Sequence, residues 1–198
     1  MIKNKKFNLV FIGASGSGKG TQAKIIAKDY QMVHVSSGDI LRQEVAKKTQ
    51  MGKKMSQYLV KGRWVSDEII CEMIFPRLEK ASSQGFILDG SPRTVVQAGL
   101  IDDYLKKRGL RIDLVILIKV RPEVVLARRE KVVADGKKFQ TGRNDDNPEI
   151  FKKRFKSYMK TIKPILKYYR KKGVLVEIDG ERPVEDIYKD IVCKLEKI

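Results

Sequence analysis

Short apolar runs alternate along this chain with longer segments whose apolar residues recur at helical spacing. The apolar runs predict strands at residues 7–12, 32–35, 85–89, 114–118 and 174–178. The runs at 85–89 and 114–118 show no polar–apolar alternation, which is typical of parallel strands covered on both faces. Helical patterns separate the runs, at residues 23–27, 39–48, 53–61, 151–172 and 184–195 and in a segment that begins at Ser66. Strands and helices that alternate throughout predict an open α/β sandwich.

A glycine-rich segment connects the first predicted strand to the first predicted helix. It consists of Gly13, Ala14, Ser15, Gly16, Ser17, Gly18, Lys19, Gly20 and Thr21. Glycines in such a loop let successive backbone N–H groups turn toward an anion, and the following helix contributes the positive end of its dipole. Lys19 adds a mobile positive charge for the outer phosphates of a nucleotide. The pattern therefore predicts a nucleotide phosphate site.

Length and cysteine content agree with one compact intracellular domain. The chain has 198 residues, a length that suits one domain with a substantial core. It has no uncharged apolar stretch of the roughly 18 residues that a membrane span needs, and residues 1–6 contain no apolar signal region. Cys71 and Cys193 have no Cys or His at ligand spacing, so we expect reduced, buried thiols in a cytoplasmic protein and no zinc.

The formal net charge of +18 raises the question of a polyanionic partner. Residues 151–172 contain ten Lys or Arg and no acidic residue. The aromatic and aliphatic residues of this segment recur at helical spacing, which predicts a helix with one buried face and a solvated basic face. Because basicity alone does not identify a nucleic-acid binder, nucleic acid is not expected as a partner.

Polar residues follow the second and third predicted strands. Ser37 and Arg42 come after the second strand, and Asp89, Arg93 and Gln97 come at or after the end of the third. Ligands of open α/β sheets bind beyond the carboxyl ends of the strands, so these residues should face the same crevice as Lys19. Two arginines there could clamp one phosphate with their planar guanidinium groups. A carboxylate at the position of Asp89 commonly orders water bound to magnesium near such a loop.

Five separate segments resemble adenylate kinases, and the resemblance runs from residue 7 to the C-terminus. Gly18-Lys19-Gly20-Thr21 is the variant of the phosphate loop found in nucleoside monophosphate kinases. The other segments are Ser36-Ser37-Gly38-Asp39-Ile40-Leu41-Arg42, Lys61-Gly62-Arg63-Trp64-Val65-Ser66-Asp67-Glu68, Asp89-Gly90-Ser91-Pro92-Arg93-Thr94, and Thr141-Gly142-Arg143-Asn144-Asp145-Asp146-Asn147 with Arg154 eleven residues after Arg143. The resemblance implies a P-loop three-layer α/β/α sandwich with a five-stranded parallel sheet. It also implies one domain over residues 1–198, with a mobile NMP-binding insert at about 38–67 and a short lid at about 130–142.

The resemblance further implies reversible, Mg²⁺-dependent transfer of the γ-phosphoryl group of ATP to AMP, giving two ADP. Residues 13–21 would bind ATP, and Arg128 would stack on its base. AMP would contact Ser37, Gly38, Arg42, Val65, Gly90, Arg93 and Gln97. Lys19, Arg93, Arg143 and Arg154 would act at the transferring group. With a glycine at position 20, Mg²⁺ would be held mainly by nucleotide oxygens and waters, with Thr21 and Asp89 contributing through water. The resemblance is to monomeric enzymes.

The acceptor base and the lid leave alternatives open. Gln97 offers the donor and the acceptor that an adenine edge requires, and pyrimidine-specific relatives typically have Ala at the position of Ser37 and Asn at that of Thr94. AMP is therefore favoured, with a UMP/CMP kinase as the alternative. Relatives carry a phosphate-contacting arginine where this chain has Val132. Arg129, Lys137 or Lys138 could replace it, or it could be absent. A basic nucleotide- or RNA-binding paralogue with weak or no catalysis is the alternative from another class.

Overall fold

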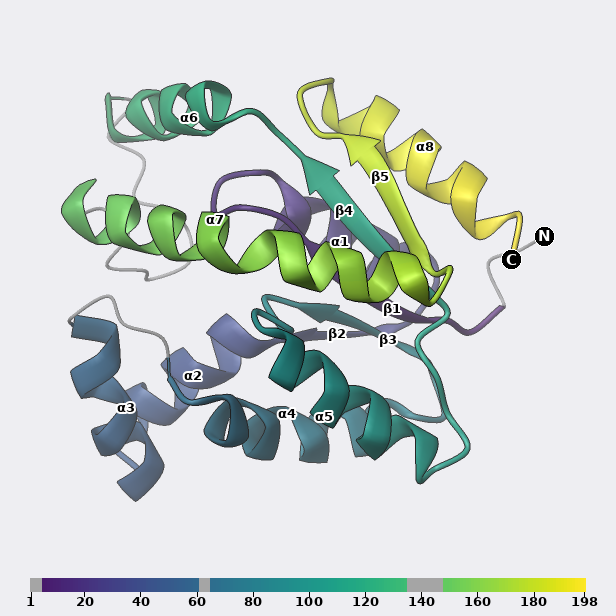
Figure 1. Cartoon of the computed structure of the whole chain (residues 1–198), viewed down its shortest axis with the longest axis horizontal. Coiled ribbons are helices and arrows are strands. Elements are labelled where there is room, and N and C mark those ends of the chain that lie inside the picture. Colours follow the sequence, from purple (N-terminus) through teal and green to yellow (C-terminus); the bar gives the residue numbers. More distant parts are fainter. Residues whose placement is uncertain (1–4, 61–64, 135–147) are drawn as a thin grey trace.

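The computed structural model of this chain describes residues 5–60, 65–134 and 148–198 (Figure 1). Strands and helices alternate in it as the sequence predicts. In chain order the elements are β1 (Asn8–Ile12), α1 (Lys19–Asp29), β2 (Val33–Ser36), α2 (Ser37–Ala46), α3 (Gln50–Val60), α4 (Asp67–Ala81), β3 (Phe86–Asp89), α5 (Val95–Lys106), β4 (Leu114–Lys119), α6 (Pro122–Ala134), α7 (Pro148–Lys171), β5 (Leu175–Asp179) and α8 (Val184–Leu195).

The strands form one five-stranded sheet in the order β2-β3-β1-β4-β5. Every pairing in it is parallel. The central strand β1 pairs on both sides, with Leu9 opposite Ile87 of β3 and opposite Leu114 of β4. The predicted five-stranded parallel sheet is confirmed. Its strand order, which no local pattern in the sequence specifies, puts the phosphate loop after the middle strand.

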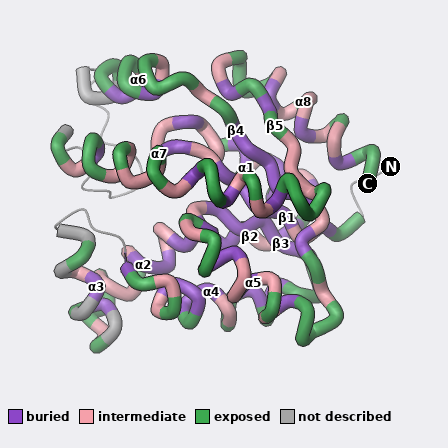
Figure 2. Tube along the Cα trace, in the orientation of Figure 1, coloured by how far each residue is buried: buried purple, intermediate pink, exposed green. Residues whose placement is uncertain are grey.

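Helices cover both faces of the sheet, as the apolar strands require. Leu9 of β1 belongs to a buried cluster with Ile26 of α1 and Ile191 of α8. The next residue, Val10, points to the other face, where α4, α5 and α7 supply buried residues that include Ile101. Because successive strand residues face opposite sides, a strand such as β1, which is apolar from Leu9 to Ile12, needs cover on both faces of the sheet. Figure 2 shows the central strands as buried. The α/β/α sandwich is confirmed.

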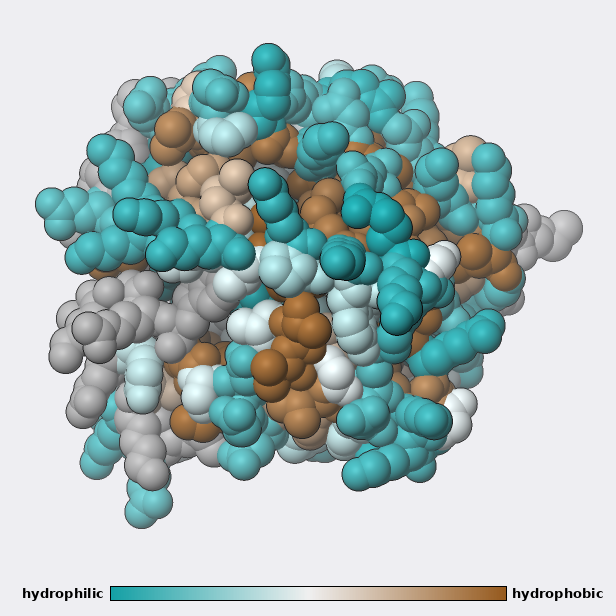
Figure 3. All heavy atoms as spheres, in the orientation of Figure 1, coloured by the Kyte–Doolittle hydropathy of each residue, from teal (hydrophilic) through white to brown (hydrophobic). Residues whose placement is uncertain are grey.

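Helix α7 has the buried face and the basic face that its sequence predicts, with one exception. Phe151, Ile162, Ile165 and Tyr169 are buried, whereas Met159, which the periodicity assigns to the buried face, is 44% exposed. Hydrophilic residues cover the outer side of this helix in Figure 3. Apart from Arg154, which is half-buried, the basic residues of 151–172 are therefore exposed to solvent.

The two cysteines differ in environment. Cys71 of α4 is buried, as expected, but Cys193 of α8 is exposed, so the prediction that both thiols are buried is wrong for Cys193. Position 193 lies on the outer side of α8, between the buried Ile191 and Leu195. Among the described residues, no helix combines the length and the apolar character that crossing a membrane demands.

Helices α2, α3 and α6 lie beyond the end of the sheet toward which β4 and β5 point (Figure 1). The segments that connect β1 to α1, β2 to α2, and β3 to α5 all begin at the carboxyl ends of parallel strands. Ligands of open parallel sheets bind at this edge. The fold thus brings the polar segments singled out in the sequence to one end of the sheet.

Candidate active site

The glycine-rich loop joins β1 to α1 with the backbone geometry that exposes N–H groups. Gly16 and Gly18 have φ angles of 86° and 89°, which favour glycine, and Gly18 is the N-cap of α1 without a side-chain cap. The first N–H groups of the helix therefore remain available to an anion. Lys19 is the first residue of α1, and its Nζ donates to the carbonyl of Ala14 at 3.3 Å. Its charge is held over the loop that precedes it.

Helix α2 starts directly after β2 because Ser36 caps it. The Ser36 hydroxyl accepts a hydrogen bond from the Asp39 backbone N–H at 3.2 Å, so the helix starts at residue 37 rather than at the predicted 39. Arg42, one turn into the helix, pairs with the Asp39 carboxylate. Arg42 Nη1 lies 3.2 Å from the point that a Cβ on Gly38 would occupy. The guanidinium group is thereby kept beside the helix N-terminus.

The segment after β3 places Arg93 close to the start of α2. Arg93 Nε donates to the Gly90 carbonyl at 2.7 Å, and its side chain is exposed to the pocket. Gly90 has a φ of 84°, and a Cβ there would stand 2.8 Å from the Ser37 hydroxyl. That hydroxyl donates to the Asp89 carbonyl at 3.3 Å. Only glycine at position 90 allows the two segments to approach this closely.

Asp89 is a buried carboxylate, 4% exposed, at the carboxyl end of β3. Its Oδ2 lies 3.6 Å from His34 Nε2 and 3.3 Å from the point that a Cβ on Gly20 would occupy. The carboxylate is therefore adjacent to the phosphate loop at the position where common forms of that loop carry a hydroxyl. Among the described residues, no three or more His, Cys, Asp or Glu side chains lie close enough together to bind a metal ion.

Gln97 is buried and hydrogen-bonded at both ends of its amide. Its Oε1 accepts from the Arg93 backbone N–H at 2.8 Å, and its Nε2 donates to Asp67 Oδ1 at 2.8 Å. Thr94, the N-cap of α5, accepts from the Gln97 backbone N–H at 3.0 Å and donates to Asp67 Oδ2 at 2.7 Å. The sequence identified Gln97 as a candidate, whereas Asp67 appeared only as one residue of the Lys61–Glu68 segment and had no role assigned to it. Nothing in the local pattern distinguishes Asp67 from the neighbouring Glu68.

Helices α6 and α7 bring arginines to the other side of the loop. Val125 of α6 packs within 3.4 Å of the Cβ position of Gly16. One turn later Arg129 is 6% exposed, with its guanidinium carbon 4.5 Å from the centroid of the Phe151 ring in α7. Arg128, on another side of α6, donates from Nη2 to the Gly180 carbonyl at 2.9 Å. Arg154 lies one turn after Phe151.

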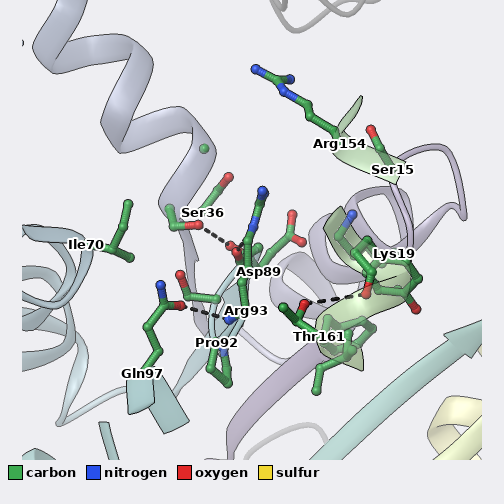
Figure 4. Close-up of a pocket in the computed structure, with 18 of the residues that line it drawn as sticks. Ser15, Lys19, Ser36, Ile70, Asp89, Pro92, Arg93, Gln97, Arg154 and Thr161 are labelled. Atoms are coloured by element: carbon green, nitrogen blue, oxygen red, sulfur yellow. Dashed lines mark hydrogen bonds between the residues drawn. The ribbon is translucent and has the colours of Figure 1, made fainter. Parts of the chain in front are cut away.

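One pocket at the end of the sheet is lined by residues of the glycine-rich loop, of α2, of the segment after β3 and of α7. In Figure 4, Asp89 and Arg93 lie between Gln97 on one side and Lys19 on the other, and Arg154 of α7, which also lines the pocket, lies above them. Of the described residues that line the pocket, those that carry charge are Lys19, Arg42, Arg93, Arg154 and Asp89. Four cations against one carboxylate leave an excess of three positive charges, which suits a ligand with several negative charges.

The comparisons with known proteins agree with this geometry. The family model described as adenylate kinase matches residues 11–174. The chain belongs to the adenylate kinase family. A protein of Archaeoglobus fulgidus named adenylate kinase is 38% identical over 216 aligned residues, which cover 96% of this chain and 99% of that protein. One of Rhizobium meliloti with the same name is 41% identical over 190 residues, covering 92% and 96%.

A third relative named adenylate kinase, from Corynebacterium urealyticum, is 37% identical over 190 residues, covering 96% of this chain and 99% of that protein. Relatives from an archaeon and from bacteria thus align with nearly the whole chain and carry one name. The family assignment favours an enzyme that phosphorylates a nucleoside monophosphate over a paralogue that only binds RNA.

Most residues to which the adenylate kinase resemblance assigns a role line the pocket. These are Gly13, Ser15, Lys19, Ser37, Gly38, Arg42, Val65, Asp89, Gly90, Arg93, Gln97 and Arg154. The structure adds residues of α7 that sequence reasoning did not identify, among them Tyr158 and Thr161. Burial raises the pKa of Tyr158 to about 12, so its hydroxyl is neutral at physiological pH. Helical periodicity assigned Tyr158 to the core and gave no signal for Thr161.

Other assigned residues lie outside the pocket or outside the described part of the chain. Ala14, Gly16, Ser17, Gly18 and Gly20 belong to the loop but do not line the pocket, and Thr21 is exposed on α1. Arg128 instead contacts Gly180. Arg143, Lys137 and Lys138 lie outside the described residues, as does the side chain of Val132. Relatives carry an arginine at the position of Val132, and the replacement of that arginine by Arg129, Lys137 or Lys138 therefore stays a prediction.

Proposed function

We propose that this protein transfers the γ-phosphoryl group of ATP to AMP and catalyses the reverse reaction from two ADP. The observation that carries the proposal is the single pocket that joins the loop lysine, Lys19, to two arginines and a buried amide at the other end. The end of the pocket at Lys19 suits the triphosphate of ATP. The end at Arg42, Arg93 and Gln97 suits a monophosphate together with its base. A kinase needs both ligands in one water-poor cleft.

ATP would bind at residues 13–21. Backbone N–H groups of the loop and the uncapped start of α1 would hold the β- and γ-phosphates. Lys19 would exchange its contact with the Ala14 carbonyl for the outer phosphates. Arg128 would cover the adenine, since α6 passes over the loop at Gly16.

AMP would bind at the end of the pocket formed by α2 and the start of α5. Arg42 and Arg93 would hold its phosphate with charge-assisted hydrogen bonds. Gln97 would read the base, while Ser37, Gly38, Val65 and Gly90 shape the cavity around the nucleoside. Binding at this end would also displace Arg42 from its pairing with Asp39 in favour of the more strongly charged phosphate.

The transfer itself needs positioning and positive charge rather than a covalent intermediate. An oxygen of the AMP phosphate forms a bond to the γ-phosphorus, and the bond from that phosphorus to the β–γ bridging oxygen breaks. The electron pair remains on the departing ADP. Lys19, Arg93 and Arg154, together with Arg143 from the lid, would stabilise the charge of the migrating group. No general base is required, because the attacking oxygen is already ionised.

Kinases that use ATP generally work with Mg²⁺, which neutralises charge on the β- and γ-phosphates. The residues of this chain fit such a complex without a cage of protein ligands. Asp89 lies beside Gly20 and could hold a metal-bound water, and Thr21, the residue directly after Gly20, would also contribute through water. Zinc is not part of this proposal.

The proposal is tested by measuring phosphoryl transfer from MgATP to AMP, GMP, UMP and CMP. We expect turnover with AMP at least about 100-fold more efficient than with the other acceptors, because a site built to hydrogen-bond one base leaves its polar groups unpaired with others. Lys19→Ala should lose nearly all activity. Lys24→Ala, on the exposed side of the same helix, is the matched control and should keep it. A preference for UMP or CMP, or no turnover by the folded protein, would refute the proposal.

We also propose a domain organisation, an oligomeric state and a cellular location for this protein. We place an NMP-binding insert at about 38–67 and a lid at about 130–142 within the single domain, and we expect both to close over the substrates. We also propose that the enzyme is monomeric, acts in the cytoplasm and does not use nucleic acid as a partner. Size-exclusion chromatography with light scattering would test whether the protein is a monomer.

A further inference from the structure

Gln97 has an amide whose two ends cannot be exchanged. Asp67, as a carboxylate, only accepts hydrogen bonds, and the Arg93 backbone N–H only donates. The amide therefore has to turn Nε2 toward Asp67 and Oε1 toward Arg93, as observed at 2.8 Å on both sides (Figure 4 draws the bond to Arg93). A flip of the amide would turn Nε2 toward the Arg93 backbone N–H, which is also a donor, and Oε1 toward the Asp67 carboxylate, which is also an acceptor. Water could not compensate for this mismatch, because Gln97 is only 2% exposed.

Thr94 determines how the Asp67 carboxylate lies. Its hydroxyl oxygen accepts from the Gln97 backbone N–H, so its single proton is free to be donated, and it goes to Asp67 Oδ2 at 2.7 Å. The other carboxylate oxygen, Asp67 Oδ1, accepts the hydrogen bond from Gln97 Nε2. Asp67, the first residue of α4, supplies one side of this network, and Arg93, Thr94 and Gln97, at and just before the N-terminus of α5, supply the other.

The constrained amide keeps one unused donor and one unused acceptor. A glutamine amide has two N–H groups and two acceptor lone pairs. Within the described part of the chain, one of each is engaged by Asp67 and Arg93. Because Gln97 lines the pocket together with Arg42 and Arg93, the remaining pair is available to a bound base.

We propose that Asp67 is a specificity-determining positioning residue: it holds Gln97 in the one orientation that matches a 6-aminopurine and mismatches a 6-oxopurine. This inference rests on the proposed function, since it concerns the acceptor base. Adenine presents the 6-amino donor beside a ring-nitrogen acceptor, which pairs with an amide C=O and N–H. A 6-oxopurine presents an acceptor at position 6 and a proton on N1. When the phosphate of such a nucleotide is held by Arg42 and Arg93, its base could pair only with a flipped Gln97 amide. The contact with Asp67 prevents that flip.

The test compares AMP with inosine monophosphate, which differs from AMP only by the oxo group at position 6 and the proton on N1. The quantity to measure is the ratio of kcat/KM for the two acceptors, with MgATP as donor. Asp67→Ala should lower this AMP preference by about tenfold or more, because it removes a charge-assisted hydrogen bond that opposes the flip. The change should be in KM for AMP, with kcat and the KM for ATP little altered.

Two variants separate positioning from a loss of structure. Asp67→Asn can still accept from Gln97 with its carbonyl oxygen and donate its NH₂ to the Thr94 hydroxyl, so it should restore most of the AMP preference. Glu68→Ala removes the neighbouring exposed carboxylate from the same helix turn and should leave the ratio unchanged. A merely structural role for Asp67 would lower turnover with both acceptors in parallel.

Should Asp67→Ala not fold, Thr94→Val replaces it, since it removes the donor that orients the carboxylate and should lower the same ratio by a smaller factor. An unchanged ratio in folded Asp67→Ala or, failing that, in Thr94→Val overturns the inference, provided that the wild-type enzyme phosphorylates AMP. No turnover of AMP by the wild-type enzyme overturns the proposed function instead.

Discussion

Gly52 of α3 lies so close to the backbone carbonyl of Glu44 in α2 that a Cβ at position 52 would overlap that oxygen. The turn between the two helices is held by Thr49, whose hydroxyl accepts from the Gly52 backbone N–H at 2.9 Å and donates to Glu44 Oε2 at 2.9 Å. The same helix α2 carries Arg42. The close approach of the two helices thus supports one wall of the acceptor end of the pocket.

Gly52→Ala should therefore destabilise the protein and weaken AMP binding. We expect a loss of about 1–3 kcal/mol in the free energy of unfolding, since a methyl group added to a packed contact forces the helices apart. The KM for AMP should rise because α2 shifts. Denaturant unfolding and steady-state kinetics measure both effects.

Gly99→Ala is the matched control for that prediction. Gly99 is also helical, but a Cβ there would meet no atom within 4 Å. Alanine in a helix interior is favoured over glycine by up to about 1 kcal/mol, so this variant should be neutral or more stable. Equal destabilisation by the two substitutions would contradict the packing argument.

Arg93→Ala should affect the acceptor end of the reaction selectively. Removing one of the two arginines that we propose for the AMP phosphate should lower kcat/KM for AMP by at least about 100-fold, since charge-assisted hydrogen bonds in a dry site strongly stabilise the transition state. The KM for ATP should change little. Arg77→Ala removes an exposed arginine that does not line the pocket and should behave as wild type.

Glu181 should contribute to the acid sensitivity of the fold. Hydrogen bonds from the Arg121 side chain and from its backbone N–H lower the pKa of this carboxyl from 4.5 to about 2. Because the folded-state pKa is depressed, the stabilisation is present above about pH 4.5 and is lost as the pH falls toward 2. Glu181→Gln should therefore lose less thermal stability over this interval than wild type does.

The measurement is the unfolding midpoint at a series of pH values from neutral to acid. Glu185→Gln, at an exposed position near the start of α8, provides the control for removing a negative charge from this region. The control should follow the wild-type profile. A Glu181→Gln profile that also parallels wild type would show that the contact with Arg121 does not persist in solution.

The two thiols should react at very different rates. Burial raises the pKa of Cys71 to about 12, whereas Cys193 is exposed. The thiolate is the reactive form, so at about pH 8 an alkylating reagent should modify Cys193 quickly and Cys71 only after denaturation. Thiol titration of the native protein should yield one fast group per chain. In Cys193→Ser that fast group should disappear; if it persists, the burial of Cys71 is not maintained.

The sequence by itself determined the class of fold and the location of the glycine-rich loop where we propose that phosphate binds. Each strand falls within one residue of its predicted bounds, and α8 has the bounds expected for it, Val184–Leu195. These features depend on local patterns: an unbroken apolar run, a helical period, a glycine loop between strand and helix. The resemblance of five segments to one family also supplied most of the residues that line the pocket.

The tertiary structure decided which of these elements meet. The order β2-β3-β1-β4-β5, the exposure of Cys193 and Met159, and the contact of Asp67 with Gln97 depend on packing between segments far apart in the chain. Asp67 and Gln97 are 30 residues apart, and only the packing of α4 against α5 joins them. A sequence pattern reports the face on which a side chain lies. It does not report what covers that face, because burial and hydrogen-bond partners come from distant segments whose arrangement depends on the whole chain.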